Sequence, residues 1–211
     1  MCIRDRDHIK EPIVVPNLNG SAYANLGKFG YFDQFSFGVR LKVDQFKEGT
    51  VLSRMVPVPK GKGYNLHLTE KGTLQANFLN RWLDDSVKVE IKEPIPLGEW
   101  VHIWVNYGGT RRAKDIGIYL NGEWAPHKTN YDFLNSNFSS DEPMRIGKGM
   151  ADLDGTVDDV RFYDRILTEN EIRVVFEQST LESIADLAAN ARSRSQKAKL
   201  DHVFISQSGP K

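Results

Sequence analysis

Short runs rich in β-branched and aromatic residues, separated by Gly, Pro and Asn, fill the chain from Phe35 to Tyr163. Alternation of two kinds of side chain is clearest over 101–107. The odd positions are apolar or aromatic, and the even positions carry His102, Trp104 and Asn106. Such a period of two indicates a strand with two different faces. No helical period appears in this stretch, which favours antiparallel strands packed as a sandwich. The predicted strands are 36–43, 50–56, 64–69, 74–80, 87–91, 101–107, 116–120, 144–147 and 156–163.

Turn residues connect these predicted strands. Asn121-Gly122 directly follows the strand 116–120, and this dipeptide suits the two positive-φ positions of a type I′ hairpin turn. The segment 57–63 holds two prolines and two glycines, so we expect an exposed loop there. The segment 129–143 is rich in Asn, Ser and Asp and is expected to be irregular.

Beyond Tyr163 the pattern changes from strand to helix. Thr168 and Glu171 have the spacing of a capping box, which predicts a short helix with an apolar stripe of Ile172, Val175 and Phe176. From residue 179 apolar residues recur at helical spacing among Ala, Ser, Lys and Arg. We therefore expect a leader over 1–12, one β-sandwich over 13–178, and a helical linker over 179–211 toward a missing C-terminal domain.

Charge argues against two classes of partner. The 211 residues contain 28 Lys and Arg and 28 Asp and Glu, so the chain lacks the net positive charge typical of proteins that bind nucleic acids or anionic lipids. No apolar run approaches the length of a membrane span, and the start does not resemble a signal peptide. A single cysteine excludes a disulfide framework or a cysteine-rich zinc site.

The first six residues, Met-Cys-Ile-Arg-Asp-Arg, back-translate to a sequence resembling the transposon end used in sequencing libraries. We therefore expect residues 1–6 to be a sequencing artefact, the alternative being a genuine polar N-terminus.

Three ordered motifs resemble those of LamG-like jelly-roll domains. The stretch 155–172, Gly-Thr-Val-Asp-Asp-Val-Arg-Phe-Tyr-Asp-Arg-Ile-Leu-Thr-Glu-Asn-Glu-Ile, is similar to that family's terminal signature. Residues 98–103 and 118–122 resemble its paired central strands and hairpin. The resemblance implies an all-β, antiparallel two-sheet jelly roll of the concanavalin A-like kind with a concave face. Such domains often bind carbohydrate or protein, and some bind calcium.

A narrower resemblance concerns residues 79–82, 92–98 and 188–200. These are similar to the LamG-like insert of large planctomycete-type proteins that also carry a cytochrome c-like domain. The resemblance implies an internal piece of an exported, extracytoplasmic multidomain protein, with a glycan or neighbouring domains of the parent chain as partners. One alternative is a purely structural insert of a redox or hydrolytic enzyme.

Catalysis by this chain is not expected. Glycan hydrolases of related architecture place carboxylates at alternating positions on one strand, and no E-x-D-x-E pattern occurs here. The five histidines are scattered, and no nucleophile elbow accompanies them. We therefore interpret the chain as a non-catalytic binding or spacer module, with a hydrolase as a further alternative.

Aromatic and polar residues gather around Trp82. An exposed indole stacks on sugar rings, and neighbouring amide, guanidinium and carboxylate groups bind hydroxyls. The alternative is a packed tryptophan beside a polar turn. Trp104 either lines the concave groove or packs under a loop. Of the other tryptophans, Trp100 is expected in the core and Trp124 opposite Ile118 or Tyr119. The candidate ligand-binding residues are Asn80, Arg81, Trp82, Asp84, Asp85 and Trp104.

Asp158 is the candidate metal ligand. Strict alternation along 156–163 places it on the core face with Val160 and Phe162, where a carboxylate needs a partner. Either it accepts local hydrogen bonds, or it binds calcium as in some relatives, with Asp152 or Asp154 nearby. The family's second contribution comes from an Asp- and Asn-rich N-terminal segment, which 17–20 matches poorly.

Overall fold

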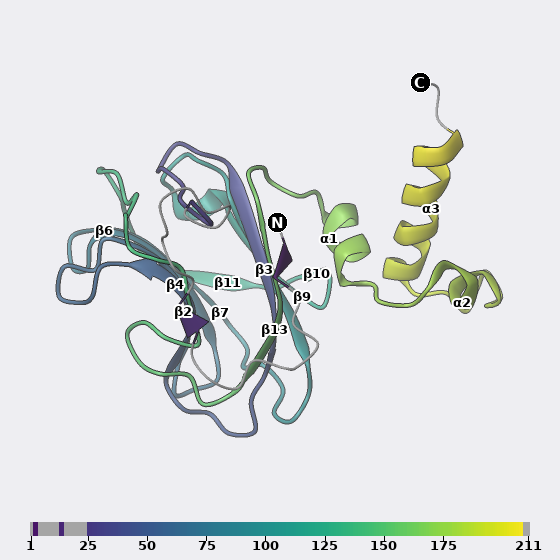
Figure 1. Cartoon of the computed structure of the whole chain (residues 1–211), viewed down its shortest axis with the longest axis horizontal. Helices are drawn as coiled ribbons and strands as arrows, with labels where there is room; N and C mark the ends of the chain where they lie inside the picture. The colour runs from purple at the N-terminus through teal and green to yellow at the C-terminus, as the bar shows by residue number, and fades with distance from the viewer. Residues whose placement is uncertain (1, 4–12, 15–24, 209–211) are drawn as a thin grey trace.

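The computed structural model describes residues 2–3, 13–14 and 25–208. Figure 1 shows two β-sheets facing each other, with the three helices following one another beside one of them. The elements in chain order are β1 (Cys2–Ile3), β2 (Ile13–Val14), β3 (Phe35–Lys42), β4 (Gly49–Met55), β5 (Gly63–Leu68), β6 (Leu74–Arg81), β7 (Asp85–Ile91), β8 (Val101–Tyr107), η1 (Ala113–Asp115), β9 (Ile116–Leu120), β10 (Glu123–Trp124), β11 (His127–Phe133), β12 (Arg145–Ile146), β13 (Thr156–Tyr163), α1 (Glu169–Phe176), α2 (Leu181–Ala185) and α3 (Arg194–Ser208).

Each sheet is antiparallel throughout. The six-stranded sheet has the order β1-β13-β3-β8-β9-β10, and the seven-stranded sheet has the order β11-β7-β6-β5-β4-β12-β2. Their facing sides bury one large aromatic and aliphatic core, in which Phe35, Tyr64, Phe78 and Phe138 lie in mutual ring contact. The predicted two-sheet jelly-roll sandwich is confirmed.

One long strand, β11, and three two-residue strands, β1, β2 and β10, are absent from the sequence prediction. The segment 129–143 was expected to be irregular, but β11 pairs with β7 along the edge of the seven-stranded sheet. Every residue of β11 is exposed or half-buried, so it lacks the alternating burial that reveals a strand in a sequence. The predicted hairpin at Asn121-Gly122 is confirmed, with both residues at positive φ.

Helix α1 covers the outer face of the six-stranded sheet. Its buried Ile172 joins a second, smaller apolar cluster with Leu167, Trp104 and Tyr119. Thr168 accepts a hydrogen bond from the Glu171 backbone, and the Glu171 carboxylate accepts one from the Thr168 N–H, as the capping box predicts.

Replacing Thr168 with Ala should lower the free energy of unfolding by about 1 kcal/mol, because the Glu171 N–H at the start of α1 loses the Thr168 hydroxyl as its partner. Urea unfolding followed by circular dichroism measures the change. Thr129→Ala, in exposed β11, is the control and should change stability far less. An equal loss in both variants would contradict the capping role.

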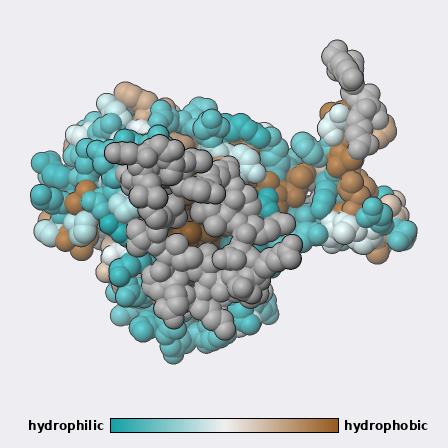
Figure 2. Space-filling model, viewed as in Figure 1, coloured by the Kyte–Doolittle hydropathy of each residue, from teal (hydrophilic) through white to brown (hydrophobic). Residues whose placement is uncertain are grey.

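The C-terminal segment folds as α2 and α3, and α3 packs against α1. Figure 2 shows hydrophobic residues collected around these helices on a face that is otherwise largely hydrophilic. Within the described part of the chain, none of α1, α2 and α3 has the length and hydrophobicity needed to cross a bilayer.

Candidate functional site

Two hairpin ends meet at one end of the seven-stranded sheet. Strands β4 to β7 run up and down in sequence order, so the β4–β5 loop and the β6–β7 turn lie at the same end. Together they line a surface hollow of about 470 Å³. The predicted loop 57–63 supplies Pro59, Lys60 and Lys62, and residues 80–84 supply the other side.

Trp82 is the central residue of this hollow. Its side chain is half-buried, and the Lys88 ammonium lies 3.9 Å from the centre of its ring. The same ammonium donates a 2.7 Å hydrogen bond to the Trp82 carbonyl, which fixes the two side chains together. The remaining surface of Trp82 lines this hollow and also a second one on the sheet face.

The polar residues predicted around Trp82 divide into two groups. Arg81 and Asp84 form an exposed ion pair at 2.9 Å beside the hollow. Asp85 is buried instead, and it accepts hydrogen bonds from Asn80 Nδ2 and from the backbone N–H of Asn135. Burial alone would raise the pKa of Asp85, but these hydrogen bonds outweigh it and lower the pKa. The prediction that Asp85 contacts a ligand is therefore wrong, because Asp85 anchors the segment after β11.

A second polar cluster lies on the side of the seven-stranded sheet that faces away from the core. His67 Nε2 lies 3.1 Å from Glu48 Oε1, and His67 Nδ1 lies 3.2 Å from Thr50 Oγ1. Burial lowers the pKa of His67, and the hydrogen bond with Glu48 only partly offsets this effect. The imidazole is thus held neutral and in one orientation at neutral pH.

Glu90 lies on the same face and is almost fully bonded. Its carboxylate accepts hydrogen bonds from Thr73 Oγ1 at 2.6 Å, Asn130 Nδ2 at 2.6 Å and Gln75 Nε2 at 3.1 Å. Burial alone would raise the pKa of Glu90. The three hydrogen bonds and the nearby Lys128 together outweigh burial, so the pKa of Glu90 lies below its ordinary value. Glu90 is therefore an ionised acceptor and is poorly suited to act as a general acid.

These polar residues border a hollow of about 390 Å³ on the sheet face, which Trp82 closes at one end. We call this hollow and the one beside Lys60 the polar trough, which Trp82 divides. Sequence reasoning missed its sheet-face half. The alternating polar positions 65 and 67, 75 and 77, and 88 and 90 contained the signal, but only strand register brings them together. The residues lining this half are Glu48, His67, Thr69, Glu70, Lys71, Gln75, Trp82, Glu90, Lys128 and Met150.

Trp104 does not contribute to the trough. It is fully buried on the outer face of the six-stranded sheet, where α1 covers it. Its indole N–H donates to Asn106 Oδ1 at 3.1 Å, and Asn106 Nδ2 donates to the Leu167 carbonyl. The prediction that Trp104 binds a ligand is wrong. Trp104 is packed instead, as the alternative predicted, but a helix and not a loop covers it.

Asp158 lies on a different face from the one predicted. Asp159, at φ 51°, forms a bulge in β13, so Val157 and Val160 both reach the core while Asp158 is half-buried on the other side. Asp158 Oδ1 accepts the Asp159 N–H at 2.7 Å.

Calcium requires six to eight oxygen ligands, and the described residues contain no cluster of three His, Cys, Asp or Glu that could hold a metal. The Asp154 carboxylate is held by Gln45 and Lys47. The N-terminal segment 17–20, which would supply the second contribution to the site, lies outside the described residues, so calcium binding at Asp158 stays a prediction.

The other two tryptophans, Trp100 and Trp124, pack against neighbouring side chains away from the trough. Trp124 pairs with Tyr119 across β10 and β9, and their rings meet edge to face at 5.3 Å, as predicted. Trp100 is half-buried rather than in the core, and the Arg40 guanidinium lies 5.2 Å from the centre of its ring. Neither tryptophan borders the polar trough.

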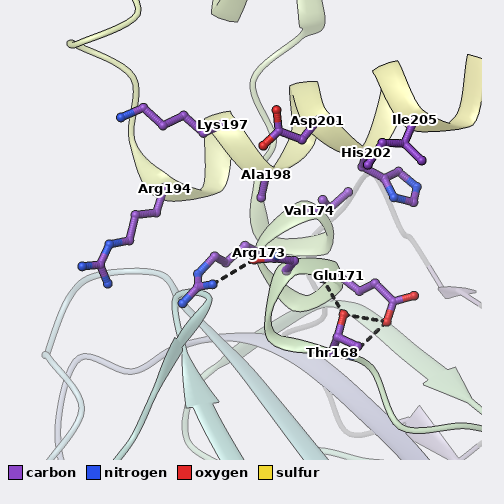
Figure 3. A pocket seen from close by; sticks show the side chains of 11 residues that line it. Thr168, Glu171, Arg173, Val174, Arg194, Lys197, Ala198, Asp201, His202 and Ile205 are labelled. Carbon is purple, nitrogen blue, oxygen red and sulfur yellow. Dashed lines mark hydrogen bonds between the residues drawn. The ribbon is translucent and has the colours of Figure 1, made fainter. Parts of the chain in front are cut away.

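A third hollow, of about 430 Å³, lies between α1 and α3. Figure 3 shows Val174 of α1 and Ala198 of α3 on its two sides, with Arg194 and Lys197 at one end and His202 and Ile205 at the other. Arg173, which also lines it, is bound to Glu123 and Glu169. Arg173 thus links α1 to β10 and is already paired, which makes the polar trough the better candidate site.

Comparison with known proteins yields one family and a group of similar folds. Residues 18–173 match the family described as the concanavalin A-like lectin/glucanases superfamily. No curated protein matches the sequence. Among solved structures, a SAP-like pentraxin from Limulus polyphemus superposes with a TM-score of 0.51 at 18% identity, over 69% of this chain and 70% of the pentraxin.

Two further solved structures carry sialidase names. The CBM40 of the Ruminococcus gnavus IT-sialidase, bound to alpha2,3 sialyllactose, gives a TM-score of 0.54 at 12% identity over 68% of this chain and 83% of that one. The Trypanosoma rangeli sialidase gives 0.51 at 16% identity over 68% of this chain but only 22% of its own. These likenesses establish the shared fold.

Proposed function

The chain belongs to the concanavalin A-like lectin/glucanase superfamily, and on this basis we propose that it is a non-catalytic module that binds a glycan along the polar trough. One observation carries the proposal: a half-buried indole, fixed by Lys88, lies between a largely apolar hollow with charged residues beside it and a more polar hollow on the sheet face. Sugar rings present apolar faces to aromatic side chains and hydroxyls to polar ones. A related fold, the CBM40 named above, is bound to a sialylated sugar, which supports this class of ligand.

Binding without hydrolysis fits the carboxylates of the trough. A glycosidase needs one carboxyl group that stays protonated and a second one across the scissile bond. The hydrogen bonds and Lys128 hold the Glu90 pKa low, so Glu90 lacks the property that a general acid needs. Release of reducing sugar from a bound polysaccharide, lost on Glu90→Gln, would establish a hydrolase instead.

Replacing Trp82 with Ala should weaken glycan binding at least about tenfold, because a central aromatic contact of this kind contributes on the order of 2 kcal/mol. A glycan array identifies the ligand, and calorimetric titration compares the affinities of the two proteins. Trp124→Ala is the matched control, since Trp124 is 48% exposed and lies outside the trough.

Two results would reject the Trp82 site. Equal weakening by both substitutions would place the ligand elsewhere, and failure of every glycan to bind would leave the purely structural role.

We further propose that the module belongs to an exported, extracytoplasmic multidomain protein with the glycan as its external partner. The motif resemblance at 79–82 and 188–200 supports this context. The complete coding sequence tests it: an export signal and further domains, including a C-x-x-C-H haem-attachment motif, are expected. A complete gene encoding only residues 1–211 would contradict it.

A further inference from the structure

The two halves of the polar trough differ in charge. The half beside the β4–β5 loop contains Lys60, Lys62 and Arg81 and is bordered by Lys88, which contacts Trp82. Asp84 is the only carboxylate that lines it, and Arg81 already binds that group. The half on the sheet face is lined by three glutamates, which include the buried and hydrogen-bonded Glu90, and by only two lysines, Lys71 and Lys128, of which Lys128 is paired with Glu90.

The cations beside Trp82 have few anionic partners in the described part of the chain. No ion pair of Lys60, Lys62 or Lys88 is found there. Asp141 lies within electrostatic range of Lys62, but Lys28 binds that carboxylate at 2.7 Å. Burial lowers the pKa of Lys88, which shows that this ammonium is partly desolvated without a compensating negative charge.

Resting on the proposed glycan-binding function, we infer that the trough selects acidic glycans and places a carboxylate or sulfate group of the sugar between Lys60, Lys62 and the Trp82 edge. An anionic group there gains charge-assisted hydrogen bonds from the two lysines. The adjoining neutral sugars then extend over the sheet face, where the exposed Glu70 accepts hydrogen bonds from hydroxyls and the exposed Lys71 donates them.

A continuous polyanion such as single-stranded nucleic acid fits the trough less well. Its phosphates would continue past Trp82 toward the sheet-face half, where the three glutamates outnumber the two lysines and repel a second negative charge. The chain as a whole has equal numbers of acidic and basic residues and provides no long-range attraction for such a polymer. An oligosaccharide with an anionic group at one position matches the uneven charge of the trough.

The test compares three probes built on one neutral oligosaccharide: the first ends in a single glucuronate, the second carries the methyl ester of that glucuronate, and the third carries a single sulfate and no carboxylate. We expect at least one acidic probe to bind about tenfold more tightly than the neutral ester at low salt, and the difference to shrink as salt is added. The uronate and sulfated probes distinguish carboxylate from sulfate recognition.

Substitution of lysines tests where the acidic group of the probe binds. The double substitution Lys60→Gln and Lys62→Gln should remove most of that difference, since two exposed charge contacts together contribute roughly 1 to 2 kcal/mol. Lys92→Gln with Lys114→Gln makes the same charge change at exposed positions outside the trough and should leave binding unaltered. Melting curves establish that all variants are folded.

The outcomes separate the two proposals. Equal binding of the acidic and esterified probes, both weakened by Trp82→Ala, would overturn acid selection and keep glycan binding. Failure of all glycans, neutral ones included, would overturn the proposed function itself. Binding of oligo-dT as tight as the best acidic glycan would overturn the assignment to an acidic glycan.

Discussion

Acidification from pH 7 to pH 4 should destabilise the folded chain by about 3 kcal/mol through His102 alone. This residue is 3% exposed, and burial lowers its pKa to about 4. The unfolded chain binds a proton near the ordinary pKa of 6.5, so stability is complete above that pH and is lost as the pH falls toward 4. Each tenfold difference in proton affinity corresponds to about 1.4 kcal/mol, which gives the size of the effect.

The surroundings of His102 explain why the neutral imidazole is required. Its ring lies 5.8 Å from that of Trp104 and 5.7 Å from that of Phe176 of α1, and neither ring nitrogen has a hydrogen-bond partner among the described residues. Asp159 favours the protonated form, but Arg161 and Arg40 oppose it, so nearby charge provides little compensation for burial. A proton on His102 therefore weakens the contact between α1 and the sheet.

His102→Phe isolates the contribution of His102 from the other titrating groups. Phe fills a similar volume and removes two unpaired polar atoms, so the variant should be at least as stable as the wild type at pH 7. Urea unfolding of both proteins at several pH values gives the comparison, and the stability advantage of the variant should grow by about 3 kcal/mol between pH 7 and pH 4. Parallel pH profiles for the two proteins would show that His102 does not titrate as stated.

Sequence pattern predicted the strands whose core-facing residues are apolar, because apolar and polar side chains then alternate with a period of two, even in β8, which is buried on both faces. The edge strand β11 was missed since neither of its faces is buried. The bulge at Asp159 was also missed, because a single residue at positive φ leaves no mark in the pattern and reverses the side on which Asp158 lies. Asp tolerates this conformation better than most residues do, but that preference alone does not locate a bulge.

The candidate site was predictable only where its residues are close in sequence. Trp82, Arg81 and Asp84 belong to one turn, so their association needs no tertiary information. His67 and Glu90 come from β5 and β7, and the register of β6 between them decides that they share a face. Lys60 lies beside Trp82 only because the β4–β5 and β6–β7 connections lie at the same end of the sheet.

Gly38 explains how Trp104 fits against its sheet. Gly38 in β3 lies directly opposite Trp104 in β8 in the strand register. A Cβ atom on Gly38 would lie closer than 3 Å to two carbons of the indole, so the ring occupies the space that a side chain would fill. A glycine inside a strand often marks such a close approach, although the sequence does not name the partner.

Gly38→Ala should therefore lower the free energy of unfolding by about 3 kcal/mol, at the upper end of what overpacking costs in a rigid core. The indole has no room to retreat, because Tyr163 and the covering helix α1 hold its other side. Urea unfolding at pH 7 measures the loss. Gly30→Ala is the matched control, since its added Cβ would lie 3.3 Å from the exposed Asp33 carboxylate and farther from any other group, and it should cost less than about 0.5 kcal/mol.

A double-mutant cycle with Trp104→Phe tests whether the two residues act as a pair. The smaller ring gives the new methyl group space, so the double variant should be more stable than the sum of the single losses predicts, by at least about 1 kcal/mol. Trp104→Phe alone is destabilising because it leaves a cavity and removes the 3.1 Å hydrogen bond to Asn106. Additive losses would mean that Gly38→Ala acts through the backbone of β3, and a harmless Gly38→Ala would show that the indole can move away from the sheet.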